Sequence, residues 1–173
     1  VYIAKGDYDI TSPINLIGKS SLHVIAHPEA KFIANRSFPA NGAKLFNFNS
    51  TTQKNVKFIW EGGQFHGQNI PARTVGAPDV FAVVGDGINQ VSIKNVSLYR
   101  TKKGNRGATT MFIAAASNVY IENILVDSAD DDALYISGNQ LQTDGDHLTV
   151  TASRFNNNND GVIGKRNYKN IKV

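Results

Sequence analysis

The chain has 173 residues and no cysteine, a length that suits one domain and a composition that excludes disulfides and thiolate zinc sites. Hydrophobic residues make up 41% of the chain, which argues against disorder, and no apolar run reaches the roughly 20 residues that span a bilayer, so we expect no membrane contact. The net charge of +4 favours an anionic partner, and we rank an acidic polysaccharide above a nucleic acid because no nucleic-acid-binding motif accompanies the mild basicity.

One strand motif recurs along the chain. Its copies cover residues 56–65, 91–98, 119–126 and 148–155. In the second and third copies the apolar residues stand at offsets 0, 2, 5 and 7, and the fourth differs only by the polar Ser153. The first copy fits if its corner has gained two residues, with Glu61 and Gly62 as a bulge. Apolar residues two apart lie on the same face of a strand, so offsets 0 and 2 form one strand and offsets 5 and 7 another. The step of three between them predicts a one-residue bend that keeps the apolar side chains inward.

Recurrence at this spacing is typical of a solenoid, since one coil cannot bury its own apolar face but its neighbours can cover it. No segment has a sustained 3.6-residue pattern with helix caps. We therefore predict an all-β fold, a right-handed single-stranded parallel β-helix, as a single domain over residues 1–173. The repeat runs into both ends of the chain, so we expect a fragment that lacks its N-terminal cap and further C-terminal coils.

Two features resemble the pectate-lyase-like superfamily of parallel β-helices. The opening from Val1 to Leu16 is similar to its "iPxGxYxixxpixL" motif, and the later Asn-Val-x-Ile-x-Asn-Ile coils are similar to its repeats. The superfamily includes polygalacturonases, pectate lyases, uronan epimerases and phage tailspike depolymerases. The resemblance implies a pectin-lyase-like solenoid that acts on a polysaccharide. It also implies that the protein is located outside the cell or on a virion surface. For a phage tailspike it also implies a homotrimer.

Acidic residues near the C-terminus are the first catalytic candidates. Aligning the coils places Asp131 opposite Asp160, and residues at one position in successive coils stack at about 4.8 Å. Two carboxylates at that spacing repel, which raises one pKa and leaves an acid beside an ionised base, as glycoside cleavage requires. A separation of about 5 Å suits a retaining hydrolase and roughly 6.5–9.5 Å an inverting one. The alternative is that the Asp-Gly and Asn-rich stretches are ordinary turns.

A second resemblance concerns the same acidic run. The segment from Asp131 to Gly138 is similar to the "DDxxxIxxG" segment of polygalacturonases, which implies Asp131 and Asp132 as the acid and base. Asp130 precedes this pair and is a further catalytic candidate. Asp160 with the following glycine is similar to the Asp-Gly coils of uronan epimerases and lyases, in which nearby cations neutralise the uronate.

The remaining candidates are substrate-binding residues, namely Lys165, Arg166, Asp127 and Tyr99. Lys165 and Arg166 supply the cations. Tyr99, Trp60 and Tyr135 alternate with apolar strand positions. Two placements are open for Trp60 and Tyr99: they face outward and stack on sugar rings, or they pack in the core, and the sequence favours neither. His66 and His147 are expected to be polar surface residues, because they are not near each other in register.

A metal is not required by this pattern, and we expect no cofactor. Calcium takes six to eight oxygen ligands. The carboxylates of Asp127, Asp130 and Asp132 are compatible with that chemistry, although no loop of fixed metal spacing is present.

Two functions from different classes follow. The first is a carbohydrate-active β-helix that cleaves a long acidic polysaccharide with stacked Asp carboxylates, as a glycoside hydrolase or a lyase. The alternative is a non-catalytic glycan-binding or structural module of a phage tail spike or surface adhesin, in which the Asp ladder only solvates turns.

Overall fold

The computed structural model describes residues 1–18, 20–39, 44–50, 55–71, 80–85, 88–100, 109–114, 117–129, 132–137, 146–156, 163–166 and 168–173, with the backbone alone for 163–166. These residues form nineteen β-strands and contain no helix. Accordingly, no described segment is a helix long and apolar enough to cross a membrane.

The strands belong to three sheets, which we name A, B and C. Sheet A contains β1 (Tyr2–Ile3), β4 (Leu22–Ala26), β7 (Val56–Glu61), β10 (Ile88–Lys94), β13 (Asn118–Glu122), β16 (His147–Thr151) and β19 (Ile171–Lys172). Sheet B contains β2 (Gly6–Ile10), β5 (Ala30–Ala34), β8 (Gln64–His66), β11 (Ser97–Tyr99), β14 (Leu125–Asp127) and β17 (Arg154–Asn156). Sheet C contains β3 (Ile14–Ile17), β6 (Phe46–Asn49), β9 (Phe81–Val84), β12 (Met111–Ala114), β15 (Leu134–Ser137) and β18 (Ile163–Arg166).

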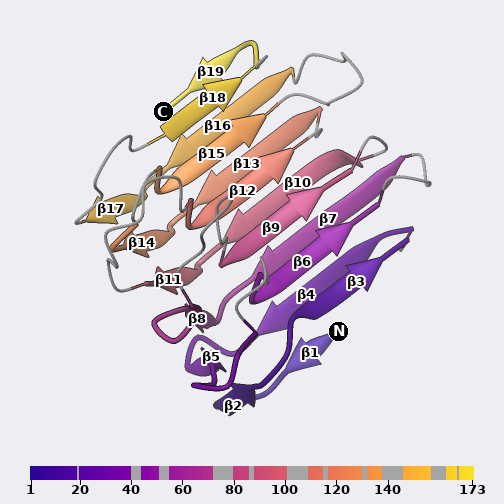
Figure 1. Cartoon of the computed structure of the whole chain (residues 1–173). Helices are drawn as coiled ribbons and strands as arrows, with labels where there is room; N and C mark the ends of the chain where they lie inside the picture. Colours follow the sequence, from indigo (N-terminus) through magenta and orange to yellow (C-terminus); the bar gives the residue numbers. More distant parts are fainter. Residues whose placement is uncertain are drawn as a thin grey trace.

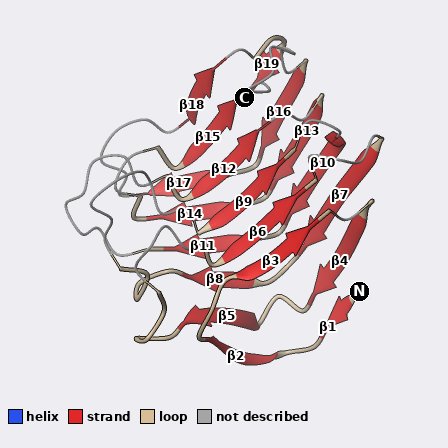
Figure 2. Cartoon of the chain, turned by 45° about the vertical axis from the view of Figure 1, so that its right-hand side comes forward, coloured by secondary structure: helices blue, strands red, loops and turns tan. Residues whose placement is uncertain are grey.

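Every strand pairs in parallel with the strand three places along the chain, so the chain visits sheets A, B and C in turn and then returns to A. Figures 1 and 2 show the resulting stack, which rises from β1 to β19. The predicted parallel β-helix is confirmed. We number its coils by their sheet A strands, so that β7 begins coil 3, β10 coil 4, β13 coil 5 and β16 coil 6. Corners AB and BC are the residues that join a strand of the first sheet to the next strand of the second.

The strand register confirms the alignment of the later motif copies. Val119 pairs with Val91 on one side and with Leu148 on the other. The predicted one-residue bend is a corner of two residues, because β13 ends at Glu122 and β14 begins at Leu125.

The first motif copy is placed differently from our prediction. Phe58 pairs with Val91, so the copy begins at Phe58 and not at Val56. Glu61 therefore ends β7, and no residues are inserted in the corner. The register irregularity between β7 and β10 lies instead between Ile88 and Gln90.

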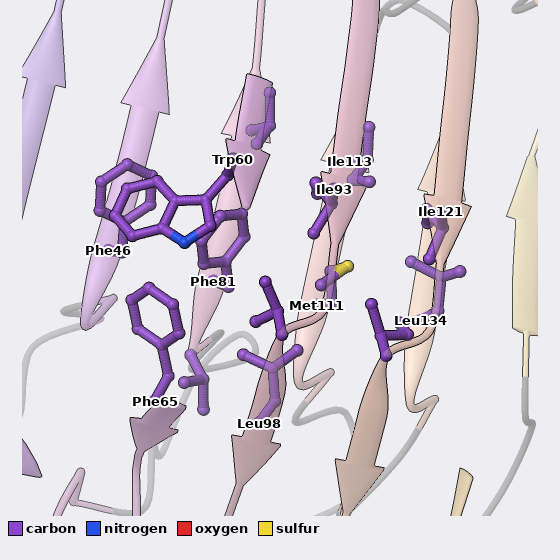
Figure 3. Close-up of a cluster of buried hydrophobic side chains, with 14 of the residues drawn as sticks. Phe46, Trp60, Phe65, Phe81, Ile93, Leu98, Met111, Ile113, Ile121 and Leu134 are labelled. Atoms are coloured by element: carbon purple, nitrogen blue, oxygen red, sulfur yellow. The ribbon is translucent and has the colours of Figure 1, made fainter. Parts of the chain in front are cut away.

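The solenoid interior is one continuous apolar core whose character changes along its axis. Aromatic rings fill the early coils, namely Phe32, Phe46, Phe58, Trp60, Phe65 and Phe81. Aliphatic side chains and one methionine fill the middle coils, namely Ile93, Leu98, Met111, Ile113, Ile121 and Leu134, and aromatic Tyr168 joins the core in the last coil. Figure 3 shows the junction of the two groups. The rings of Phe46 and Phe81, in neighbouring strands of sheet C, are stacked with centroids 4.8 Å apart.

Trp60 belongs to this core, so of the two placements that the sequence left open the inward one is found. Its side chain is 3% exposed, and its indole Nε1 donates a hydrogen bond to the Gly62 carbonyl at 2.9 Å. Trp60 pairs with Ile93 in the register of sheet A, which is an inward position. A buried indole requires a partner for its N–H, and the adjacent corner supplies one.

Corner AB has the same two-residue form in coils 3 to 6. Its residues are Gly62 and Gly63, Asn95 and Val96, Asn123 and Ile124, and Ala152 and Ser153. The first residue of each pair has positive φ, from 51° at Asn123 and Ala152 to 82° at Gly62. Glycine and asparagine tolerate this left-handed conformation best. The two asparagine side chains also form a ladder, in which Asn123 Nδ2 donates to Asn95 Oδ1 at 2.7 Å.

Candidate functional site

An outward row of side chains crosses sheet B. The register places His66, Tyr99, Asp127 and Asn156 side by side on successive strands. Each is partly or fully exposed, while the residue before it points into the core. Two predicted substrate-binding residues, Tyr99 and Asp127, are therefore neighbours on one face, since adjacent strands lie about 4.8 Å apart.

His66 extends this row into a ring platform. Its imidazole stacks on the Tyr99 ring, with centroids 4.8 Å apart and planes 22° apart. Burial lowers the pKa of His66, and the positive charge of Lys31 lowers it further. The ring is therefore neutral at pH 7, with one nitrogen donating and the other accepting. This matches its contacts of 3.3 Å, from Nε2 to Gln64 Oε1 and from Gln68 Nε2 to Nδ1.

Corner BC of coil 5 begins directly after Asp127 and leads to Asp132 and β15. The carbonyl of Asp132 accepts a hydrogen bond from the Thr110 N–H at 3.2 Å. The carbonyl of Asp127 accepts one from the Arg100 N–H at 3.0 Å. These bonds tie the corner of coil 5 to that of coil 4 and place the two aspartates at opposite ends of one corner.

Arg100 lies in the corresponding corner of coil 4. Its side chain is 2% exposed, and it is the only charged side chain that is buried in the described part of the chain. A buried guanidinium is costly unless oxygen atoms accept its hydrogen bonds. Among the described residues of coils 4 and 5, corner BC holds one charged residue of each sign, Arg100 in coil 4 and Asp132 in coil 5.

A second ring platform lies on the other side of this corner, on the outward face of sheet C. Phe112 of β12 and Tyr135 of β15 pair in register, and both alternate with buried neighbours. Their rings are stacked, with centroids 5.7 Å apart and planes 28° apart. Lys44 Nζ lies 5.8 Å from the Phe112 centroid, within the range of a cation–π contact.

Several predicted site residues lie outside the described part of the chain, namely Asp130, Asp131 and Asp160. The described pairs on either side follow the predicted alignment, since Asp127 pairs with Asn156 and Leu134 with Ile163. Lys165 and Arg166 are described by their backbone alone and pair with Ile136 and Ser137.

No metal centre is found where the structure describes the chain: no three His, Asp or Glu side chains gather closely enough there to hold an ion. The calcium hypothesis rested on Asp127, Asp130 and Asp132, and Asp130 is not among the described residues.

Three contributors to this region were missed in the sequence, namely Phe112 as the stacking partner of Tyr135, the stacking role of His66, and buried Arg100. A signal for the first was present. Met111-Phe112-Ile113 and Leu134-Tyr135-Ile136 share one pattern, an aromatic residue between two apolar ones, which in a strand places the ring opposite its neighbours. No local pattern indicates that Arg100 is buried.

Comparison of the chain with models of known protein families, with curated proteins and with solved structures finds no match.

Proposed function

We propose that the chain is a carbohydrate-active β-helix that binds a long acidic polysaccharide along its outer surface and cleaves it at corner BC. One observation carries the proposal: the rings of Phe112 and Tyr135 stack on each other on the outer side of sheet C, beside the corner that holds Asp132. Sugar rings stack on exposed aromatic faces through their apolar C–H surfaces. The row of His66, Tyr99 and Asp127 offers a second contact across the same corner.

The chemistry would come from carboxylates at this corner. Asp132, with Asp130, Asp131 and Asp160 as candidates from the sequence, would supply an acid that protonates the glycosidic oxygen. A second carboxylate would activate water or attack the sugar. Lys165 and Arg166, in the strand next to β15, would neutralise uronate groups.

The resemblance to the pectate-lyase-like superfamily supports the same substrate class. A solenoid with rows of residues in register offers an extended surface that suits a polymer. A polysaccharide of this size would be encountered outside the cell or on a virion surface.

Binding is tested by truncating one ring of the platform. We expect Tyr135→Ala to weaken binding of the polysaccharide between about twofold and tenfold, the usual contribution of an aromatic stack. Tyr120→Ala is the matched control, because Tyr120 is a 43% exposed tyrosine on the outer face of sheet A. Equal losses in the two variants would contradict a site at sheet C.

Cleavage is tested with a glycan panel that is read both for new reducing ends and for the absorbance of an unsaturated uronate. We expect Asp132→Asn and Asp131→Asn to abolish turnover and retain binding, while Glu122→Gln, an exposed carboxylate of sheet A, keeps full activity. Reducing ends with the absorbance indicate a lyase, and reducing ends without it indicate a hydrolase. Binding without turnover on any glycan would contradict cleavage and favour the non-catalytic module.

A further inference from the structure

A groove of about 500 Å³ runs along corner AB, away from the platform on sheet C. Its lining residues are Pro28, Asn95, Ser97, Asn123, Ile124, Leu125, Ala152 and Arg154. This volume is within the ~300–1,000 Å³ usual for small-ligand clefts. We propose that this groove is a binding site for an acidic oligosaccharide. The inference concerns corner AB and does not depend on the function proposed for corner BC.

The asparagine ladder ends inside the groove. Asn123 Nδ2 donates to Asn95 Oδ1. In the next coil Ala152 occupies the ladder position and offers Asn123 Oδ1 no donor. At the other end of the ladder stands Gly62, which has no side chain to accept from Asn95 Nδ2. Within the described residues, neither of these amide atoms makes a hydrogen bond.

Two more polar groups converge on the same groove. Ser97 and Arg154 stand in one outward row of sheet B, with Leu125 between them. Neither the Ser97 hydroxyl nor the Arg154 guanidinium has a side-chain partner in the part of the chain that the structure describes. Three other surface cations are paired, namely Lys5 with Glu29, Lys31 with Asp7, and Lys94 with Glu122.

These groups define the ligand by their chemistry. One guanidinium suits one carboxylate, while an amide donor, an amide acceptor and a hydroxyl suit sugar hydroxyls. The apolar surfaces of Leu125, Ile124 and Pro28 suit the C–H face of a sugar ring. A nucleic acid is disfavoured, because its binding requires several cations in a row and the groove presents one.

The location is tested by nuclear magnetic resonance with tetragalacturonate as the probe and its methyl ester as the neutral match. We expect tetragalacturonate to shift the backbone amides of Asn95, Ser97, Leu125 and Arg154. We expect the methyl ester to bind about tenfold more weakly, since the charged contact to Arg154 is lost. Equal binding of acid and ester, stronger binding of an Asp/Glu hexapeptide, or shifts confined to other faces would overturn the proposal.

A pair of substitutions at one position separates binding from folding. Ala152→Asn extends the ladder, satisfies Asn123 Oδ1 and fills the groove, so we expect a higher urea midpoint together with at least about fivefold weaker binding. Ala152→Gly is the control, because it favours the same backbone and leaves the groove open, with unchanged affinity.

The charged contact is tested by Arg154→Gln, which we expect to weaken binding of the acid about tenfold and that of the ester little. Undiminished tetragalacturonate binding in both Arg154→Gln and Ala152→Asn would contradict the site. Asp132→Asn and Tyr135→Ala should leave the shifts at corner AB intact, so this proposal and that for corner BC can fail separately.

Discussion

Replacing the first residue of corner AB should have opposite effects in two coils. Gly62 and Ala152 occupy the same corner position, with φ of 82° and 51°. Left-handed backbone costs a residue other than glycine about 1–2 kcal/mol. Glycine in turn loses about 0.4–1 kcal/mol more chain entropy on folding. We therefore expect Ala152→Gly to stabilise the protein by roughly 0.5–1 kcal/mol, the difference between these two terms.

Gly62→Ala should destabilise the protein by more than the backbone term alone. A Cβ at Gly62 would lie 2.0 Å from the Ala26 carbonyl oxygen, so the backbone of one coil must shift. Overpacking adds about 1–3 kcal/mol, which gives a total loss of roughly 2–4 kcal/mol once the entropy gain is subtracted.

Urea unfolding of both variants measures these changes, with Trp60 fluorescence and circular dichroism as independent probes. The chain has one tryptophan, and its indole contacts the carbonyl of Gly62. A stability change should move the midpoint and leave the slope unchanged. Loss of stability in Ala152→Gly, or a neutral Gly62→Ala, would refute the assignment of a strained left-handed corner.

Two further predictions concern the core and the ring platform. Trp60→Ala should cost about 3–5 kcal/mol, because its ring packs on Phe46 with centroids 4.8 Å apart, and Trp60→Phe should cost less; equal urea midpoints for the two variants would argue against an aromatic core. Burial lowers the pKa of His66 in the folded protein, so the unfolded chain binds the proton first as pH falls. The free energy of unfolding should therefore decrease below the ordinary histidine pKa of 6.5 and become constant below the pKa of the folded protein. Unfolding from pH 8 to pH 4 should show a smaller decrease in His66→Gln, and parallel curves for the two proteins would contradict a buried imidazole.

The strands of sheets A and B in coils 4 to 6 could be predicted from the sequence because a two-residue corner joins them in each of these coils. Two residues separate β10 from β11 and β13 from β14, so the apolar offsets repeat. Sheet C has no such fixed offset. Corner BC runs from 100 to 110 in coil 4 and from 128 to 133 in coil 5, so spacing alone does not align the strands that follow.

The inward position of Trp60 was missed because the first strand of the first motif copy was misaligned. Aligning Val56 with Val91 required two extra residues and left Trp60 beyond the apolar offsets. Glycine at Gly63 stands where later coils have Val96 and Ile124, which removed the apolar marker of the corner. Glycine and asparagine favour positive φ, so either residue can mark the first position of a corner. A rule that uses these two residue types would align Gly62 with Asn95 and place Trp60 inward beside Ile93.

The contacts between side chains of neighbouring coils could not be predicted from the sequence, although some of the neighbours could. The neighbours Tyr99 and Asp127 follow from register alone. His66, the partner of Tyr99, follows Phe65, and the predicted pairing of Phe65 with Leu98 is confirmed; that the two outward rings stack on each other is not encoded in residue spacing. Residue spacing does not encode the burial of Arg100, because Arg100 lies in corner BC, which has no fixed length.

A crystal structure of the chain with the longest oligosaccharide that it binds from the glycan panel tests the proposed function most directly. We expect sugar rings over Phe112 and Tyr135, with a glycosidic oxygen near Asp132. Sugar density that avoids sheet C and corner BC would contradict the proposed function.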